Sequence, residues 1–215
     1  MTSDVVHLPT RKRAPSKRAL ATKARVLDAA EVVFATKGFD GATIRDIATK
    51  AGEPVGTIHH HGGGKERLFY QTVARKAAAL SELRLSALNA CKDSSTVTVE
   101  TVLSAFFKPF FDITQKDPSW QNYARLVAYV STDTRWRGIA HECFDPTLEP
   151  FMQTLTELLP ETSRQKLAAT IVFSVSAFLA LLTTRDRIGA IGGGNTAELE
   201  ELQTLIRFCA RGMEA

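Results

Sequence analysis

The 215-residue chain has few cysteines and lacks the short motifs of common enzyme classes. Cys91, Cys143 and Cys209 are odd in number and widely spaced, which excludes a disulfide framework and a paired-cysteine metal site. The sequence contains no G-x-S-x-G, no P-loop and no G-x-G-x-x-G, so it predicts neither an enzyme nor a bound cofactor. The first 25 residues have no apolar segment typical of a secretory signal, and we therefore expect a cytoplasmic protein.

Strand patterns are also absent, and the apolar period is helical from residue 22 onward. The period, with glycine and proline as helix boundaries, predicts an all-α fold. The expected helices span 22–37, 44–51, 54–61, 65–91, 97–115, 118–131, 134–159 with a bend at Pro146, 163–187 and 196–212.

The positive charge is concentrated near the N-terminus. Residues 11–76 carry 14 Lys or Arg against 6 Asp or Glu, whereas residues 77–215 carry 13 against 16. This asymmetry is typical of a polyanion-binding module joined to a different domain, although a solvated basic face has the same composition. Residues 1–21 are basic and have no apolar period, which predicts a disordered tail or, alternatively, an arm that lies along DNA.

Two short helices joined by a turn at Gly52 follow the first predicted helix. Thr43 can cap the first of them, with Asp46 as its reciprocal partner, and Pro54 suits the first turn of the second. A tri-helical unit of this kind is typical of helix-turn-helix proteins. The segment 22–69 resembles the TetR family in Ala42-Thr43-Ile44-Arg45-Asp46-Ile47-Ala48, Ala51-Gly52, Gly56-Thr57-Ile58, His60-His61 and Lys65-Glu66 ahead of Leu68-Phe69.

The resemblance implies an N-terminal three-helix DNA-binding head over 22–69, preceded by the basic tail 1–21. It also implies a helical ligand-binding and dimerisation domain over 70–215. Small side chains at the start of the second short helix suit a major groove, and free N–H groups at neighbouring helix N-termini favour phosphates. The predicted DNA-binding residues are Thr43, Arg45, Pro54, Val55, Gly56, Thr57, His59, His60, His61 and Lys65.

Three residues depart from the pattern of the family. The family has an apolar residue where this chain has Glu53, a phosphate-contacting tyrosine where it has His59, and an aromatic residue where it has Gly62. Loss of the aromatic predicts a weaker core, by about 2–4 kcal/mol, unless a neighbour compensates.

The run from His59 to Gly64 invites two other interpretations. Consecutive helical residues point about 100° apart, so the three histidines cannot converge on one metal ion and no metal is predicted. The string His61-Gly62-Gly63-Gly64 matches the oxyanion hole of lipases, but the sequence contains no nucleophile elbow to accompany it.

Residues 167–184 form an 18-residue stretch without charge, which is the lower limit for a membrane span. Several Ser and Thr residues dilute it, and we favour a dimer-interface helix over a membrane helix; a monomer is the other alternative. The resemblance implies that the last two long helices form a four-helix bundle with a second copy. The expected contact stripes are Ile171, Val175, Phe178 and Leu182, and then Leu199, Leu202, Leu205, Ile206 and Cys209.

Eight of the twelve phenylalanines fall between residues 106 and 178. Such a concentration packs a core, and collectively it can also line an apolar pocket. Segments at 125–126, 136–137 and 144–146 resemble a TetR subgroup whose members include sensors of fatty-acid-like or aromatic effectors. The candidate ligand-binding residues are Phe106, Phe107, Phe110, Trp120, Tyr123, Phe144 and Phe151, with Arg125 or His141 as a polar anchor.

These observations predict a homodimeric repressor that binds a palindromic operator in double-stranded DNA and releases it when a small, largely apolar effector binds. A DNA-architectural protein that coats duplexes without sequence preference is the alternative. A footprint distinguishes the two, because only the repressor protects a palindrome at physiological salt.

Overall fold

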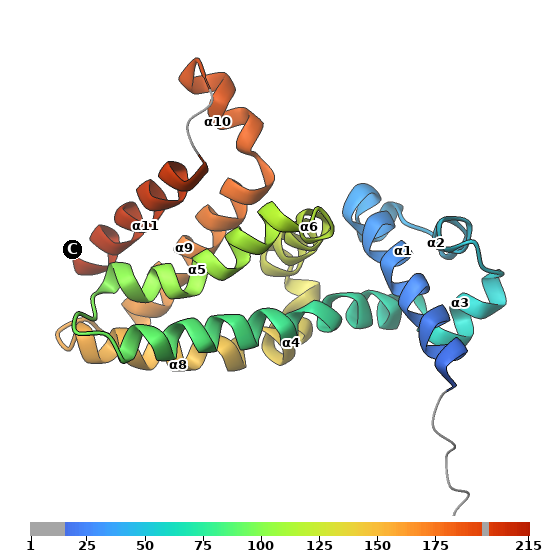
Figure 1. The fold of residues 1–215 in the computed structure, drawn as a ribbon, viewed down its shortest axis with the longest axis horizontal. Coiled ribbons are helices and arrows are strands. Elements are labelled where there is room, and N and C mark those ends of the chain that lie inside the picture. The colour runs from blue at the N-terminus through green and yellow to red at the C-terminus, as the bar shows by residue number, and fades with distance from the viewer. Residues whose placement is uncertain (1–15, 195–197) are drawn as a thin grey trace, which may run out of the picture.

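The computed structural model describes residues 16–194 and 198–215, and within these ranges the only regular elements are helices (Figure 1). The all-α prediction is confirmed. In chain order the elements are α1 (Lys17–Gly41), α2 (Ile44–Ala51), α3 (Val55–Gly62), α4 (Lys65–Lys92), α5 (Val99–Lys116), α6 (Ser119–Thr132), the 3-10 turn η1 (Thr134–Trp136), α7 (Arg137–Cys143), α8 (Asp145–Leu158), α9 (Arg164–Thr183), α10 (Arg185–Gly192) and α11 (Glu198–Glu214).

The first helix begins earlier than the apolar period predicts. The Ser16 hydroxyl accepts a hydrogen bond from the Ala19 backbone N–H at 3.2 Å, so α1 starts at Lys17 and residues 17–21 are helical rather than part of a tail. The predicted tail residues 1–15 lie outside the described residues. Near its other end, Gly38 has φ 69° and interrupts the helix, at the place where a glycine stop is expected.

Two helices that the sequence predicts as continuous are divided in the structure. The segment 134–159 contains η1, α7 and α8, and the break lies at Phe144. Pro146 occupies the first turn of α8, where its missing N–H needs no partner, and so this proline begins a helix instead of bending one. The segment 163–187 is divided at Thr184 into α9 and α10.

The long helix α4 runs along the length of the molecule and connects its two ends (Figure 1). Helices α1–α3, called the head here, lie at its first turns, and helices α5–α11, called the body, lie along its remainder, where α5–α8 contact it. Buried apolar side chains continue from head to body in one cluster. The expected domain boundary at residues 69–70 falls inside α4, so the head and the body share this helix, and α1 also packs directly on α6.

Candidate DNA-binding surface and ligand cavity

The helix α2 begins with the reciprocal cap that the sequence predicts. The Thr43 hydroxyl accepts from the Asp46 backbone N–H at 3.1 Å, and an Asp46 carboxylate oxygen accepts from the Thr43 backbone N–H at 3.0 Å. Lys37 donates to the same carboxylate at 2.7 Å. The hydrogen bond from Lys37, followed by those from Thr43, lowers the pKa of Asp46 to about 2. These contacts fix α2 onto the end of α1.

Gly52 ends α2 in the left-handed conformation, with φ 65°, and turns the chain into α3. The carbonyl of Pro54 accepts from the Thr57 backbone N–H at 2.9 Å, so Pro54 is the N-cap of α3 rather than its first helical residue. Ile58 is fully buried, whereas Pro54, Val55 and Gly56 are exposed. The start of α3 therefore presents small side chains to solvent.

The three histidines follow on the same helix. His59 and His60 are exposed, His61 is partly exposed, and the rings of His60 and His61 meet edge to face with centroids 5.0 Å apart. Across residues 16–194 and 198–215, no group of three or more His, Cys, Asp or Glu side chains is placed to hold a metal ion. The histidines lie in the last turn of α3, where the partial negative charge of the helix end favours cations.

Gly62 occupies the site of the missing aromatic residue and packs closely on Leu68 of α4. A Cβ added to Gly62 would lie 2.9 Å from Leu68 Cδ1 and 3.2 Å from Leu68 Cβ. Leu68 is fully buried and fills the space between α3 and α4. The buried Leu68 therefore lies directly against Gly62, and a larger side chain at residue 62 would collide with it.

Glu53 also has a structural partner, the guanidinium of Arg25 on α1. The Glu53 side chain is mostly buried and that of Arg25 is half exposed. This ion pair attaches the turn between α2 and α3 to α1, in a position where the family has an apolar contact. Glu53 therefore still attaches this turn to α1, through an ion pair in place of an apolar contact.

Predicted phosphate-binding residues lie on both sides of α3. Thr43 and Arg45 are exposed at the start of α2. Lys65, at the start of α4, is partly buried: its ammonium lies 4.5 Å from the centroid of the Phe39 ring and donates to the Asp40 carbonyl at 3.3 Å. In this structure, contacts with Phe39 and Asp40 therefore hold the Lys65 side chain against the end of α1.

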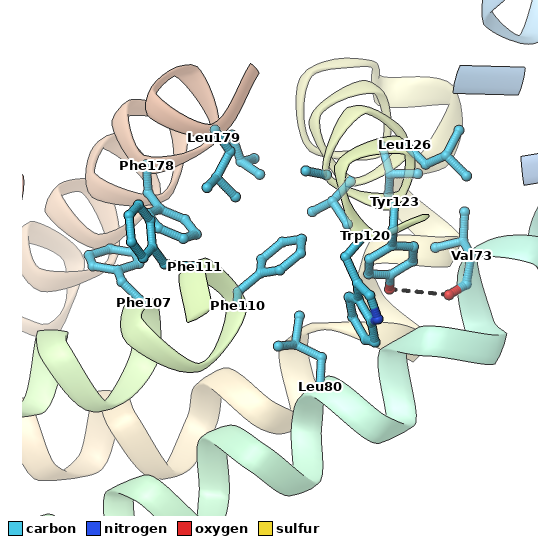
Figure 2. Packing of buried hydrophobic residues seen from close by; sticks show 14 of the residues in the cluster. Val73, Leu80, Phe107, Phe110, Phe111, Trp120, Tyr123, Leu126, Phe178 and Leu179 are labelled. Carbon is cyan, nitrogen blue, oxygen red and sulfur yellow. Dashed lines mark hydrogen bonds between the residues drawn. The ribbon is translucent and has the colours of Figure 1, made fainter. Parts of the chain in front are cut away.

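A cavity of about 180 Å³ lies in the body between α4, α5, α6, α7, α8 and α9. Three of the predicted ligand-binding residues, Phe106, Phe110 and Phe144, line it. Figure 2 shows Phe110 projecting from α5 between Phe178 of α9 and the Trp120 and Tyr123 pair of α6. The other lining residues are Leu80, Arg84, Val127, Ser131, Ala140, Asp145, Leu148, Ile171, Val172, Val175, Ser176, Phe178 and Leu179.

The remaining predicted ligand residues lie elsewhere. Phe107 stacks on Phe178 with centroids 4.7 Å apart, and Phe151 packs edge to face on Phe106. Trp120 and Tyr123 are buried behind Phe110, and the Tyr123 hydroxyl donates to the Val73 carbonyl at 3.2 Å (Figure 2). These four residues support the cavity wall without lining it.

The two expected polar anchors do not reach the cavity. Arg125 and His141 are both exposed, and neither is among the lining residues. Sequence reasoning missed Arg84, the one lysine or arginine in the lining. The sequence did contain a sign of its position. Arg84 is four residues from both Leu80 and Leu88, so it lies on the apolar stripe of α4, where a charged residue is unexpected.

Helices α9 and α11 pack together and leave a large apolar surface exposed on their outer side. Phe208 is 71% exposed and Phe173 is 68% exposed, and Val172 and Leu199 are at least half exposed. Grooves of about 620 and 570 Å³ lie along this surface, and Phe208 lines both.

This surface differs from the expected dimer stripes. Ile171, Phe178 and Leu182 are buried inside the chain, as are Leu202, Ile206 and Cys209, so these residues form core contacts. Of the predicted positions only Leu199 is strongly exposed. The α9 helix is apolar on two sides. The stripe predicted from the apolar period of the sequence lies on the side that packs against the core of the same chain, and not on the exposed side.

The helix α9 is long enough and apolar enough to cross a membrane, with a mean hydropathy of 1.9. One face of α9 packs against α6, α8 and α11, and the opposite face belongs to the exposed apolar surface described above.

Comparison with known proteins identifies the arrangement. The model of bacterial regulatory proteins of the tetR family matches residues 26–72, and the model of the tetracyclin repressor-like C-terminal domain matches residues 104–212. The chain belongs to the TetR family. This membership agrees with the prediction of a regulator rather than an enzyme.

The curated relative and the solved structures resemble this TetR-family chain over different lengths. The transcriptional repressor AcnR of Corynebacterium efficiens is 36% identical over 61 residues, which are 28% of this chain and 32% of AcnR, so the chain spans about a third of the length of that curated relative. A TetR-like regulator from Rhodococcus sp. RHA1 has a TM-score of 0.63 at 19% identity, covering 90% of this chain and 96% of that one. The FadR regulator of Bacillus subtilis, solved in complex with stearoyl-CoA, has a TM-score of 0.61 at 19% identity over 88% of this chain and 98% of FadR.

Proposed function

We propose that the protein is a cytoplasmic, homodimeric transcriptional repressor that binds a palindromic operator and dissociates from it when a small, largely apolar ligand enters the body. The observation that carries this proposal is the exposure of the start of α3. Pro54, Val55 and Gly56 face solvent while Ile58 anchors the same helix in the head. A helix held from one side and lined with small residues on the other fits a major groove.

The flanking residues supply the contacts that fix the helix on DNA. Thr43 and Arg45 at the start of α2 and Lys65 at the start of α4 reach the two phosphate backbones, while Val55, Gly56 and Thr57 meet base edges. The exposed His59 and His60 extend the contact along one strand, with His61 beside them. Backbone contacts set the register, and base contacts provide the selectivity.

Dimerisation follows from the outer surface of α9 and α11. Two copies related by a two-fold axis bury Phe173 and Phe208 against one another, because a surface this apolar is costly in water. The paired α3 helices then lie about 34 Å apart, one turn of B-DNA. A palindromic operator mirrors this symmetry.

The cavity in the body is the ligand site. Ligand binding favours the state whose cavity it fills better, and α4 transmits the change to the head because it is continuous from Lys65 to Lys92. The stearoyl-CoA bound to FadR joins a long apolar acyl chain to a charged coenzyme A part, and it binds a protein of the same fold. At roughly 30 Å³ for each water-sized group, about 180 Å³ admits a chain of about six groups, much shorter than a stearoyl chain.

Selection from randomised duplexes at physiological salt, followed by a footprint, tests the function. We expect one palindrome with half-sites about 10 base pairs apart. Gly56→Glu should abolish selection, since a Cβ at Gly56 meets nothing within 4 Å and the added carboxylate would enter the negatively charged groove of the duplex. Gly138→Glu, at an equally open position on α7, is the matched control and should select the same palindrome. Uniform, salt-sensitive coating of every duplex would support the architectural alternative.

A further inference from the structure

Arg84 is a cation in the wall of an otherwise mostly apolar cavity. Its Nε donates to the Phe106 carbonyl at 2.9 Å, and the centre of its guanidinium lies 3.9 Å from the centroid of the Phe106 ring and 5.7 Å from that of Phe110. The two phenylalanines and the carbonyl hold the guanidinium in one orientation. Its position is therefore fixed before any ligand arrives.

No carboxylate neutralises this guanidinium. Within residues 16–194 and 198–215, no Asp or Glu oxygen lies within 4.0 Å of Arg84 in an ion pair, although the other arginines and lysines that pack between helices, such as Arg75 and Lys76, have acidic partners. Burial lowers the pKa of Arg84 to about 9, so the group still carries its charge at neutral pH. A partly buried charge without a counter-ion is costly, and an anion in the cavity would reduce that cost.

Asp145 is the one acidic residue in the lining, and it is engaged elsewhere. Its side chain is 58% exposed and lies 3.2 Å from His141 Nδ1 on the outside of the body. Asp145 therefore marks the solvent side of the cavity, and Arg84 marks the side against α5. The polar lining residues Ser131 and Ser176 carry no charge.

We propose that the ligand of this cavity is a short amphiphilic carboxylic acid, whose carboxylate pairs with Arg84 and whose apolar chain or ring contacts Phe106, Phe110 and Phe178. A guanidinium offers two parallel N–H donors that match the two oxygens of a carboxylate. The volume of about 180 Å³ accommodates an apolar part of about six groups. This inference rests on the proposed ligand site and specifies its chemistry.

Three probes of equal length test the inference on the full-length protein: hexanoate, 1-hexanol and hexylamine. Calorimetry and thermal shift should show that hexanoate binds the wild type about 10- to 100-fold more tightly than 1-hexanol, as a charge-assisted pair predicts. Hexylamine should bind more weakly than either, because its ammonium would meet Arg84. Tighter binding of 1-hexanol or hexylamine, or no binding of hexanoate, would overturn the proposal without need of a variant.

Variants then assign the effect to Arg84. Arg84→Gln should remove the preference of hexanoate over 1-hexanol while leaving the binding of 1-hexanol unchanged. Arg84→Lys keeps the charge and should retain part of the preference for hexanoate over 1-hexanol. This variant still tests the role of Arg84 if the glutamine variant does not fold. Lys116→Gln, an exposed cation at the end of α5, should behave as the wild type. Undiminished preference for hexanoate in both Arg84 variants would overturn the assignment.

The outcome is separable from that of the proposed function. Operator binding by the unliganded protein tests the head and the dimer without any ligand. If hexanoate binds through Arg84 but leaves the operator complex intact, the carboxylate proposal is supported and the proposal that this ligand releases the operator is contradicted. If the protein binds the operator but no carboxylic acid binds the protein, the proposed DNA-binding function is supported and the carboxylate proposal is contradicted.

Discussion

Lys76 on α4 donates to the carboxylate of Glu31 on α1 at 2.7 Å, inside the contact between head and body. Glu31 is 2% exposed, which makes it the most deeply buried acidic residue of the head. The same ammonium donates to the Ser119 hydroxyl of α6 at 2.8 Å and lies 5.0 Å from the centroid of the Trp120 ring. One lysine therefore touches the head and the helix that supports the ligand cavity.

Lys76→Met should destabilise the protein more than any loss of a surface ion pair. It leaves the Glu31 carboxylate buried with only the longer 3.3 Å contact to Arg75, and the expected loss is about 3 kcal/mol in the free energy of unfolding. Urea denaturation at fixed protein concentration measures it. The control is Lys108→Met, which removes an exposed pair with Asp112 and should cost about 0.5 kcal/mol or less. Equal losses in the two variants would show that Glu31 does not depend on Lys76.

Gly62→Ala should destabilise the head although alanine favours helices. The added Cβ would lie 2.9 Å from Leu68 Cδ1, and we expect a cost of about 1–3 kcal/mol from overpacking. Gly138→Ala, within α7 and with open space around its Cβ, is the matched control and should be neutral or slightly stabilising. Thermal unfolding compares the two. Adding Leu68→Ala to Gly62→Tyr should recover stability, and no recovery would show that Leu68 is not what excludes a larger side chain at residue 62.

The elements of the head could be predicted closely because their boundaries are set by local chemistry. Thr43 and Asp46 form a cap within four residues, and Gly52 adopts a conformation that few other residues tolerate. Such signals do not depend on distant parts of the chain. Pro146 shows the limit, because a proline within an apolar period fits a bend and a helix start equally well.

The ligand and dimer surfaces were less predictable because they depend on tertiary contacts. The apolar period of α9 indicates that two of its sides are apolar, but only the packing of α6 and α8 decides that Phe178 faces inward and Phe173 outward. Arg84 is a surface residue by type and a cavity residue by position. The sequence predicts which residues are candidates, and the fold decides which of them meet.

The cap of α2 should make part of the stability depend on pH. The pKa of Asp46 is lowered to about 2, so its contribution is fully present above the ordinary carboxyl pKa of about 4 and is lost as the pH falls toward about 2. Asp46→Asn should therefore lower the melting temperature at pH 7, with a difference that narrows below pH 4. Asp112→Asn, in an exposed pair outside the head, is the control. A difference that stays constant from pH 7 to pH 3 would count against the ionised cap.

The outer surface of α9 and α11 should determine the oligomeric state. Phe208→Asp places a charge at the side chain that lines both grooves, and we expect a monomer in sedimentation equilibrium at concentrations where the wild type is a dimer. Leu83→Asp, at an exposed apolar position on α4, is the matched control and should leave the dimer intact. If the Phe208 variant sediments as a dimer while Leu83→Asp does not, the interface lies elsewhere.

Lys65→Ala should weaken binding to all duplexes alike, because the proposed contact of Lys65 is with a phosphate and not with a base. Loss of one phosphate contact reduces the slope of log affinity against log salt by about 1, and the selected palindrome should not change. Val55→Ala should have the opposite signature, with an altered base preference at one position and an unchanged slope. Lys92→Ala, at the other end of α4, controls for the loss of a positive charge. The ammonium of Lys65 also holds Phe39 and Asp40, so thermal unfolding must accompany the titrations. A change of preferred sequence in the Lys65 variant, with its fold intact, would move this residue from the phosphate backbone to the groove.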